Sequence, residues 1–137
     1  MREITYKIKD VELQDNKHYL TKGKLYLSEG MVFECVSGGY GRGTIPLGKY
    51  VVEAPIEIEN TEQYKAYRRD GFPWISKLTP IGKCEDAEGD RTGLLIHPDG
   101  NLPNTLGCIG IIENDIACYG ILSSLFEENQ SLLLKVV

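Results

Sequence analysis

The sequence predicts a mainly β protein with one or two helices, an α+β fold formed by a single domain over residues 1–137. Short apolar runs bounded by Gly, Pro and Asn recur along the chain, as in proteins rich in strands. One late segment has apolar residues at helical spacing. Hydrophobic residues make up 42% of the chain, which suffices for one core. No repeat, linker or low-complexity tract divides it.

Alternation of apolar and polar residues predicts strands in the first half. Residues 4–8 alternate Ile, Tyr and Ile with Thr and Lys, which is typical of a half-buried strand. Residues 24–27 and 31–36 flank a Ser-Glu-Gly turn and predict a hairpin. A glycine-rich loop at 37–43 precedes another strand at 49–52.

The middle of the chain is more polar. Residues 57–70 are weakly helical, with Thr61 as a candidate helix cap. Residues 79–92 are rich in Asp, Glu and Gly and predict a polar insertion. The apolar run 93–97 then predicts a short strand that ends on a histidine.

The last third predicts a strand, a helix and a strand. Residues 108–112 are a short apolar run. Residues 113–128 carry apolar side chains near helical spacing, and Asn114 is a candidate N-cap. Residues 131–137 predict the final strand.

Charge and composition exclude several classes of function. The net charge of −5 argues against a nucleic-acid partner, which would need a basic surface. No apolar run approaches the roughly 20 residues of a membrane-spanning helix. The N-terminus has no apolar region typical of a signal peptide. The cysteines form no CxxC pair, so no zinc site and no metal or other cofactor is predicted. Cys35 and Cys118 fit free buried thiols, and Cys84 lies in a polar segment.

One cysteine and one histidine suggest nucleophilic catalysis. His97, one of two histidines, stands eleven residues before Cys108, and each lies at the edge of an apolar run. A neighbouring imidazole can accept the proton of a thiol. Backbone N–H groups around Gly107 and Cys108 are candidates for an oxyanion hole. Spacing alone fits equally a core histidine and a small buried cysteine.

The stretch GLLIHPDGNLPNTLGCIGI, residues 93–111, resembles the active-site segment of L,D-transpeptidases, the YkuD-like family. Those enzymes carry an I-H-G start and an S/T-H-G-C-I finish. Leu106 and Gly110 stand where the family has its second His and an Arg. The closest pattern, H-x-G-N…T-x-G-C-I, is that of compact variants in type VI secretion effectors and phage-encoded proteins. Upstream, the family's T-P-x-G-x-Y/F segment is matched by Thr44, Pro46, Gly48 and Tyr50.

The resemblance implies a YkuD-like β-sandwich with the Cys/His site at a strand–loop edge. It implies that Cys108 is the nucleophile and His97 its base, in acyl transfer or hydrolysis on peptidoglycan stem peptides. It also implies that residues 54–92, which have no clear counterpart in the family, form a lid or insertion.

Further residues are candidates for binding the oxyanion or the substrate: Gly107, Thr105, Asp99 and Tyr50. Asp99 is a candidate to orient His97 or bind a substrate amine, although a Pro-Asp-Gly turn explains it as well. Two arginines are candidates to replace the missing carboxylate contact, Arg42 and Arg91, and two more aromatics to line a peptide groove, Tyr40 and Trp74.

Such a substrate places the protein's action in the bacterial periplasm or cell wall, reached by another export route or by phage delivery. A secreted antibacterial effector would have a cognate immunity protein as partner. The alternative is a non-catalytic structural or cell-wall-binding domain on the same fold.

Overall fold

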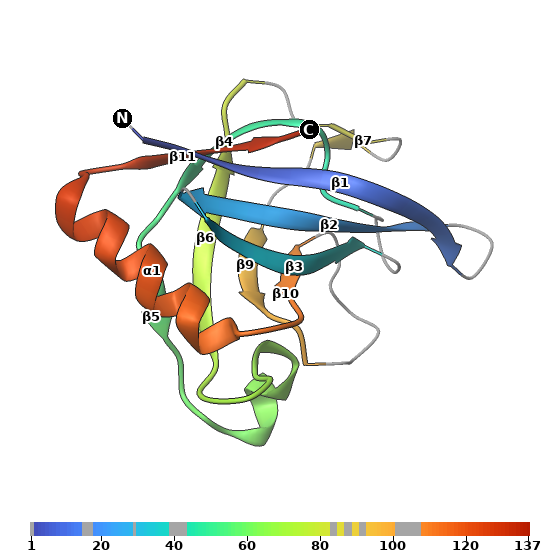
Figure 1. Ribbon diagram of the computed structural model, residues 1–137. Coiled ribbons are helices and arrows are strands. Elements are labelled where there is room, and N and C mark those ends of the chain that lie inside the picture. The colour runs from blue at the N-terminus through green and yellow to red at the C-terminus, as the bar shows by residue number, and fades with distance from the viewer. Residues whose placement is uncertain are drawn as a thin grey trace.

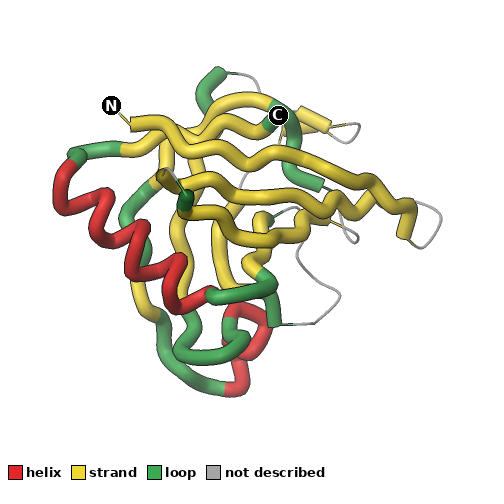
Figure 2. Tube along the Cα trace, in the orientation of Figure 1, coloured by secondary structure: helices red, strands yellow, loops and turns green. Residues whose placement is uncertain are grey.

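The computed structural model describes residues 2–14, 18–28, 30–38, 44–82, 85–86, 89–90, 93–100 and 108–137. The elements are β1 (Arg2–Gln14), β2 (His18–Ser28), β3 (Met31–Gly38), β4 (Gly48–Val52), β5 (Ile56–Glu57), the 3₁₀ helix η1 (Glu62–Tyr67), β6 (Trp74–Pro80), β7 (Glu85–Asp86), β8 (Gly89–Asp90), β9 (Leu94–Pro98), β10 (Ile109–Ile111), α1 (Asp115–Glu128) and β11 (Leu132–Val136). Strands dominate, with one α-helix and one 3₁₀ helix in the described part (Figures 1 and 2). The prediction of a mainly β fold with one or two helices is confirmed.

Eight of the strands form a sheet that closes on itself. Their order is β4-β11-β1-β2-β3-β10-β9-β6, and β6 pairs back to β4. Neighbours are antiparallel except for β1 with β11 and β9 with β10, which are parallel. The short β5 adds to β6, while β7 and β8 pair only with each other. The more specific expectation of a YkuD-like sandwich stays a prediction.

The core fills the inside of this sheet because apolar residues occupy alternate strand positions. Ile4 and Tyr6 of β1 are at most 1% exposed, as the alternation at residues 4–8 predicts. The predicted hairpin forms from β2 and β3, where inward-facing Leu25 pairs with Phe33. A strand with one buried face has a fixed register, since a slip by one residue would turn its apolar set outward.

The predicted late helix is α1, which packs against the same core. Cys118, Leu122 and Leu125 are buried on one of its faces, and Tyr119 lies edge-on to Phe72 with ring centroids 5.0 Å apart. The predicted N-cap, Asn114, does occupy that position. Its side chain makes no capping hydrogen bond, and its φ of 55° is left-handed, which Asn tolerates better than most residues.

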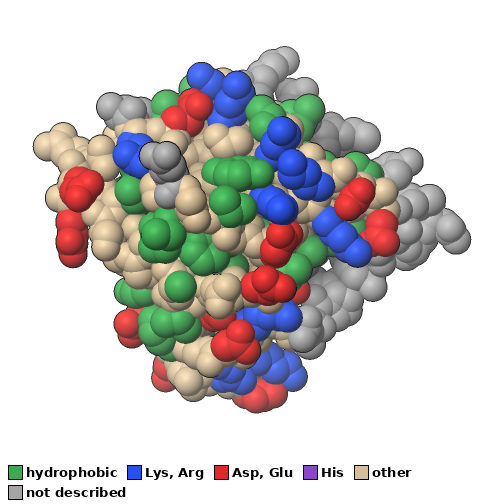
Figure 3. Space-filling model, viewed as in Figure 1, with side chains coloured by type: hydrophobic (Ala, Val, Ile, Leu, Met, Phe, Trp, Pro, Cys, Tyr) green, Lys and Arg blue, Asp and Glu red, His purple; other side chains and the backbone are tan. Residues whose placement is uncertain are grey.

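The outer surface carries charge pairs between neighbouring strands. Lys22 lies 3.4 Å from Glu12, and Lys24 lies 3.5 Å from Glu34, all about half exposed. Figure 3 shows acidic and basic side chains interspersed over the face in view. Exposed pairs of this kind contribute at most about 1 kcal/mol each, so their main effect is a well-solvated surface.

None of the helices in the described part of the chain is long and apolar enough to cross a membrane.

Candidate active site

The parallel strands β9 and β10 position the two predicted catalytic residues, since His97 lies in β9 and Cys108 directly precedes β10. Ile96 pairs with Ile109 and His97 pairs with Gly110. Ile96 and Ile109 are completely buried in the core. Because successive side chains of a strand alternate between its faces, His97 lies on the outer face of β9, and Cys108 directly precedes β10.

Extended by one residue, the register of this pair puts Cys108 diagonally across from His97. The same offset relates Asp99 to Gly110, and a Cβ at Gly110 would lie only 2.9 Å from the Cβ of Asp99. Diagonal neighbours on paired strands are close enough for long side chains to touch. The register therefore brings the backbones of the two residues near each other, although they stand eleven residues apart in the sequence.

The imidazole of His97 is held in one orientation by its own backbone. Nδ1 donates a hydrogen bond to the carbonyl oxygen of Pro98, at 2.6 Å. Since a carbonyl only accepts, Nδ1 carries the proton and Nε2 has the lone pair. Nε2 is buried and has no hydrogen-bond partner among the described residues. Burial lowers the pKa of His97 to about 4, although the bond to Pro98 opposes that shift, so the ring is neutral at neutral pH.

Cys108 is one of three buried cysteines in the described part of the chain that form no disulfide. It is 6% exposed, and its Sγ lies 3.9 Å from the carbonyl oxygen of Gly93, a weak hydrogen bond. The other two thiols, Cys35 and Cys118, lie in the core. Burial raises the pKa of both well above the usual range. Both are buried free thiols, as the sequence predicts, and a buried thiol with a raised pKa is a poor nucleophile.

The 3₁₀ helix η1 packs over the end of β9. Gly100 N–H donates to the carbonyl of Ala66 at 3.1 Å, and a Cβ on Gly100 would lie 2.4 Å from the carbonyl oxygen of Lys65. Only glycine fits so close an approach. The contact sets Tyr67 edge-on against His97, with ring centroids 4.7 Å apart.

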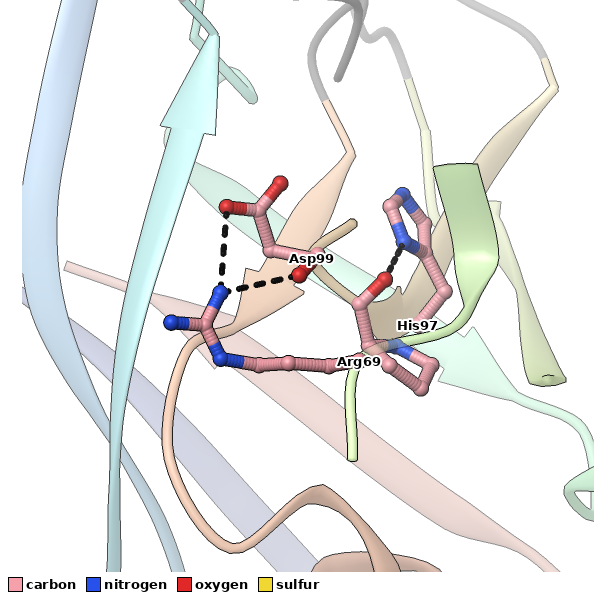
Figure 4. Close-up of polar contacts among 4 residues, drawn as sticks. Arg69, His97 and Asp99 are labelled. Atoms are coloured by element: carbon pink, nitrogen blue, oxygen red, sulfur yellow. Dashed lines mark hydrogen bonds and ion pairs between the residues drawn. The ribbon is translucent and has the colours of Figure 1, made fainter. Parts of the chain in front are cut away.

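Asp99 contacts Arg69 on the chain that follows η1. Nη1 of Arg69 donates to the backbone carbonyl of Asp99 at 2.9 Å and lies 3.9 Å from its carboxylate. Figure 4 shows that the Asp99 carboxylate points toward Arg69 and away from the imidazole of His97. The carbonyl of Pro98, rather than Asp99, orients that ring.

Two of the candidate aromatics lie elsewhere. Tyr50 is 1% exposed on β4, in the core, and its hydroxyl donates to the carbonyl of Pro46 at 2.6 Å. Trp74 is completely buried in the same core. Both lie on the inner face of the sheet, opposite to His97, so the structure does not bring them to this site. Several further candidates lie outside the described residues: Thr105, Gly107, Tyr40, Arg42, Arg91 and Cys84.

Sequence reasoning missed Tyr67 and Arg69. Both lie in the segment expected to be a lid or insertion, and no motif marks them. The only signal is weak: two tyrosines three residues apart, Tyr64 and Tyr67, whose rings stack at 6.4 Å in η1.

The described residues contain no cluster of three or more His, Cys, Asp or Glu side chains that could hold a metal ion. Comparison of the chain with protein-family models, curated proteins and solved structures gives no match.

Proposed function

We propose that this protein is a cysteine-dependent acyltransferase or peptidase of the L,D-transpeptidase type that acts on peptidoglycan stem peptides. The observation that carries the proposal is the pairing of β9 with β10, which brings the backbones of His97 and Cys108 near each other, together with a buried Nε2 of His97 that has no hydrogen-bond partner among the described residues. The resemblance of residues 93–111 to the active-site segment of that family supports the substrate class.

In the acylation step, the thiol proton of Cys108 passes to Nε2 of His97 as Sγ attacks the carbonyl carbon before the terminal D-alanine. The carbon–nitrogen bond then breaks, and the imidazolium returns its proton to the departing amine. A thioester remains on Cys108. An amine, a free D-amino acid or water attacks it, His97 takes the acceptor's proton, and Sγ leaves and recovers its proton from His97.

The low pKa of His97 decides how this step begins. A buried neutral imidazole does not form a resting ion pair with a thiol, so the proton moves as the carbon–sulfur bond forms. Developing negative charge on the substrate oxygen and on Sγ then stabilises the imidazolium. The oxyanion would be bound by backbone N–H groups near Cys108.

The proposed place of action is the bacterial periplasm or cell wall. The compact pattern around Cys108 supports a role as a secreted antibacterial effector, with an immunity protein as partner, or as a phage protein.

The test is mass spectrometry of disaccharide-tetrapeptide muropeptides incubated with the purified protein. We expect loss of D-alanine, a cross-linked dimer or an exchanged D-amino acid, and the product identifies the acceptor. Cys108→Ala should abolish the product. His97→Gln should lower the rate by roughly 100-fold or more, since general-base catalysis contributes that much.

Cys118→Ala is the matched control, because it also removes a buried free thiol but leaves Cys108 in place. It should retain activity. A wild-type protein that is folded and leaves every muropeptide unchanged would contradict the proposal and favour a non-catalytic or cell-wall-binding domain.

A further inference from the structure

Tyr67 lies where three parts of the chain meet. It is the last residue of η1, and its ring packs edge-on against the imidazole of His97 at an interplanar angle of 71°. The ring of Tyr64 stacks beside it at 6.4 Å. His97 lies in β9, which pairs with β10, and Cys108 directly precedes β10. Tyr67 therefore covers the imidazole of the proposed base.

Bonds on both sides of Tyr67 fix its position. The residue before it, Ala66, accepts a hydrogen bond from Gly100 N–H, and Arg69 donates to the carbonyl of Asp99. Both partners directly follow β9, the strand that carries His97. These two bonds hold the tyrosine at the end of that strand, and Figure 4 shows the one between Arg69 and Asp99.

Besides packing on His97, Tyr67 interacts electrostatically with Cys108. The pKa of Tyr67 is raised mainly by burial, and the negative charge of a Cys108 thiolate raises it further, as does Tyr64. A neutral phenol near a thiolate can donate a hydrogen bond to it, and donation to a charged acceptor is stronger than between neutral groups.

We propose that Tyr67 is a third functional residue of this site. Its ring fixes the imidazole of His97, and its hydroxyl donates a hydrogen bond to Sγ of Cys108 once the thiol has lost its proton. The inference rests on the proposed function because it takes Cys108 as the nucleophile. It concerns the thiolate itself, however, and its test needs no peptide substrate.

Tyr67→Phe separates the two contributions, because it keeps the ring and removes only the hydroxyl. The rate of Cys108 alkylation by iodoacetamide is measured across a range of pH, with peptide-resolved mass spectrometry to report Cys108 alone. We expect the midpoint of the pH profile to rise by about one pH unit in Tyr67→Phe, about a tenfold loss of thiolate below the midpoint. Tyr64→Phe, the matched control, should leave the midpoint unchanged.

A second measurement does not depend on any tyrosine variant. Coupling between two sites is reciprocal, so removal of the thiolate should ease the ionisation of the phenol. We expect the pKa of Tyr67, followed by NMR of ¹³C-labelled tyrosine, to be lower in Cys108→Ser than in the wild-type protein.

An unchanged alkylation midpoint in folded Tyr67→Phe would overturn the inference, and so would an unchanged tyrosine pKa in Cys108→Ser. Shifts in both, with no activity on any muropeptide, would leave Tyr67 as the partner of a reactive thiol while overturning the proposed substrate.

Discussion

Because Gly110 has no side chain, Asp99 can occupy the space above it. Gly110 stands two residues after Cys108, where the L,D-transpeptidases have an arginine. A Cβ there would lie 2.9 Å from the Cβ of Asp99 and 3.4 Å from its Cγ, so the space above Gly110 is already filled by Asp99. Asp99 contacts Arg69, which brings a guanidinium to this face from a different segment.

Gly110→Ala should therefore destabilise the protein by about 1–3 kcal/mol, the usual cost of overpacking. The contact is with the Cβ of Asp99, which is fixed to the backbone, so a rotamer change gives little relief. The free energy of unfolding, from chemical denaturation, measures the effect.

Gly120→Ala is the control for that experiment. Gly120 lies in α1, and a Cβ there would meet nothing within 4 Å. Alanine at an open helical position should stabilise the protein by about 0.5–1 kcal/mol. Equal effects at positions 110 and 120 would contradict the crowding over Gly110.

At the scale of elements, the site depends on how β9, β10 and η1 meet. β9 and β10 are parallel, so the chain must cross back from the end of one to the start of the other. η1 closes over the end of β9 through Gly100 and Arg69. A 3₁₀ helix of six residues with no fully buried side chain has little stability of its own, so these contacts hold it in place.

Arg69→Gln should lower the free energy of unfolding by about 1–2 kcal/mol, because Arg69 makes a partly buried hydrogen bond to Asp99. It should also speed amide hydrogen exchange in η1, since the helix loses one of its attachments to β9. Both effects are measurable without a substrate.

Arg68→Gln tests whether the effect belongs to that bond rather than to loss of a positive charge. Arg68 donates to the exposed side chain of Asn60, so its loss should cost less than about 0.5 kcal/mol. An Arg69 variant no less stable than the Arg68 variant would show that the bond to Asp99 does not hold η1.

At the scale of the whole molecule, the closed sheet gives the protein one shared core. Each strand of the ring has paired neighbours on both sides, and α1 adds its apolar face to the same interior. The site lies outside this core, on the wall of the sheet, where η1 shields it. His97 is 2% exposed in this position. Because its imidazole is buried, the stability of the protein depends on pH.

Stability should fall as the pH drops from about 6.5 to about 4. The pKa of His97 is about 4 in the folded protein and about 6.5 in an unfolded chain, so the unfolded chain takes up the proton first. Protonation therefore favours unfolding in that window. The loss attributable to His97 amounts to about 3 kcal/mol and is complete near the folded pKa.

Chemical denaturation of the wild-type protein and His97→Gln at each pH isolates this effect, because the carboxylates contribute equally to both. The difference in unfolding free energy between the two proteins should shrink by about 3 kcal/mol between pH 7 and pH 4. A difference that stays constant with pH would mean that His97 is not buried in its neutral form.

Much of the fold and part of the site could be predicted from the sequence alone. Local periodicity in the sequence predicts several elements, because it depends only on neighbouring residues. These are the strand at residues 4–8, the hairpin, the short strand that includes His97 and the late helix. The assignment of Cys108 as nucleophile and His97 as its base stays a prediction from the sequence.

Only the tertiary structure decided which side chains surround that pair. Tyr50 alternates into the core although its motif suggested a substrate contact, since the face of a strand is set by register and by what packs on it. Tyr67 and Arg69 reach His97 and Asp99 from about 30 residues away along the chain. Such contacts depend on the closure of the sheet and the docking of η1, which involve residues far apart in sequence and leave no local pattern to read.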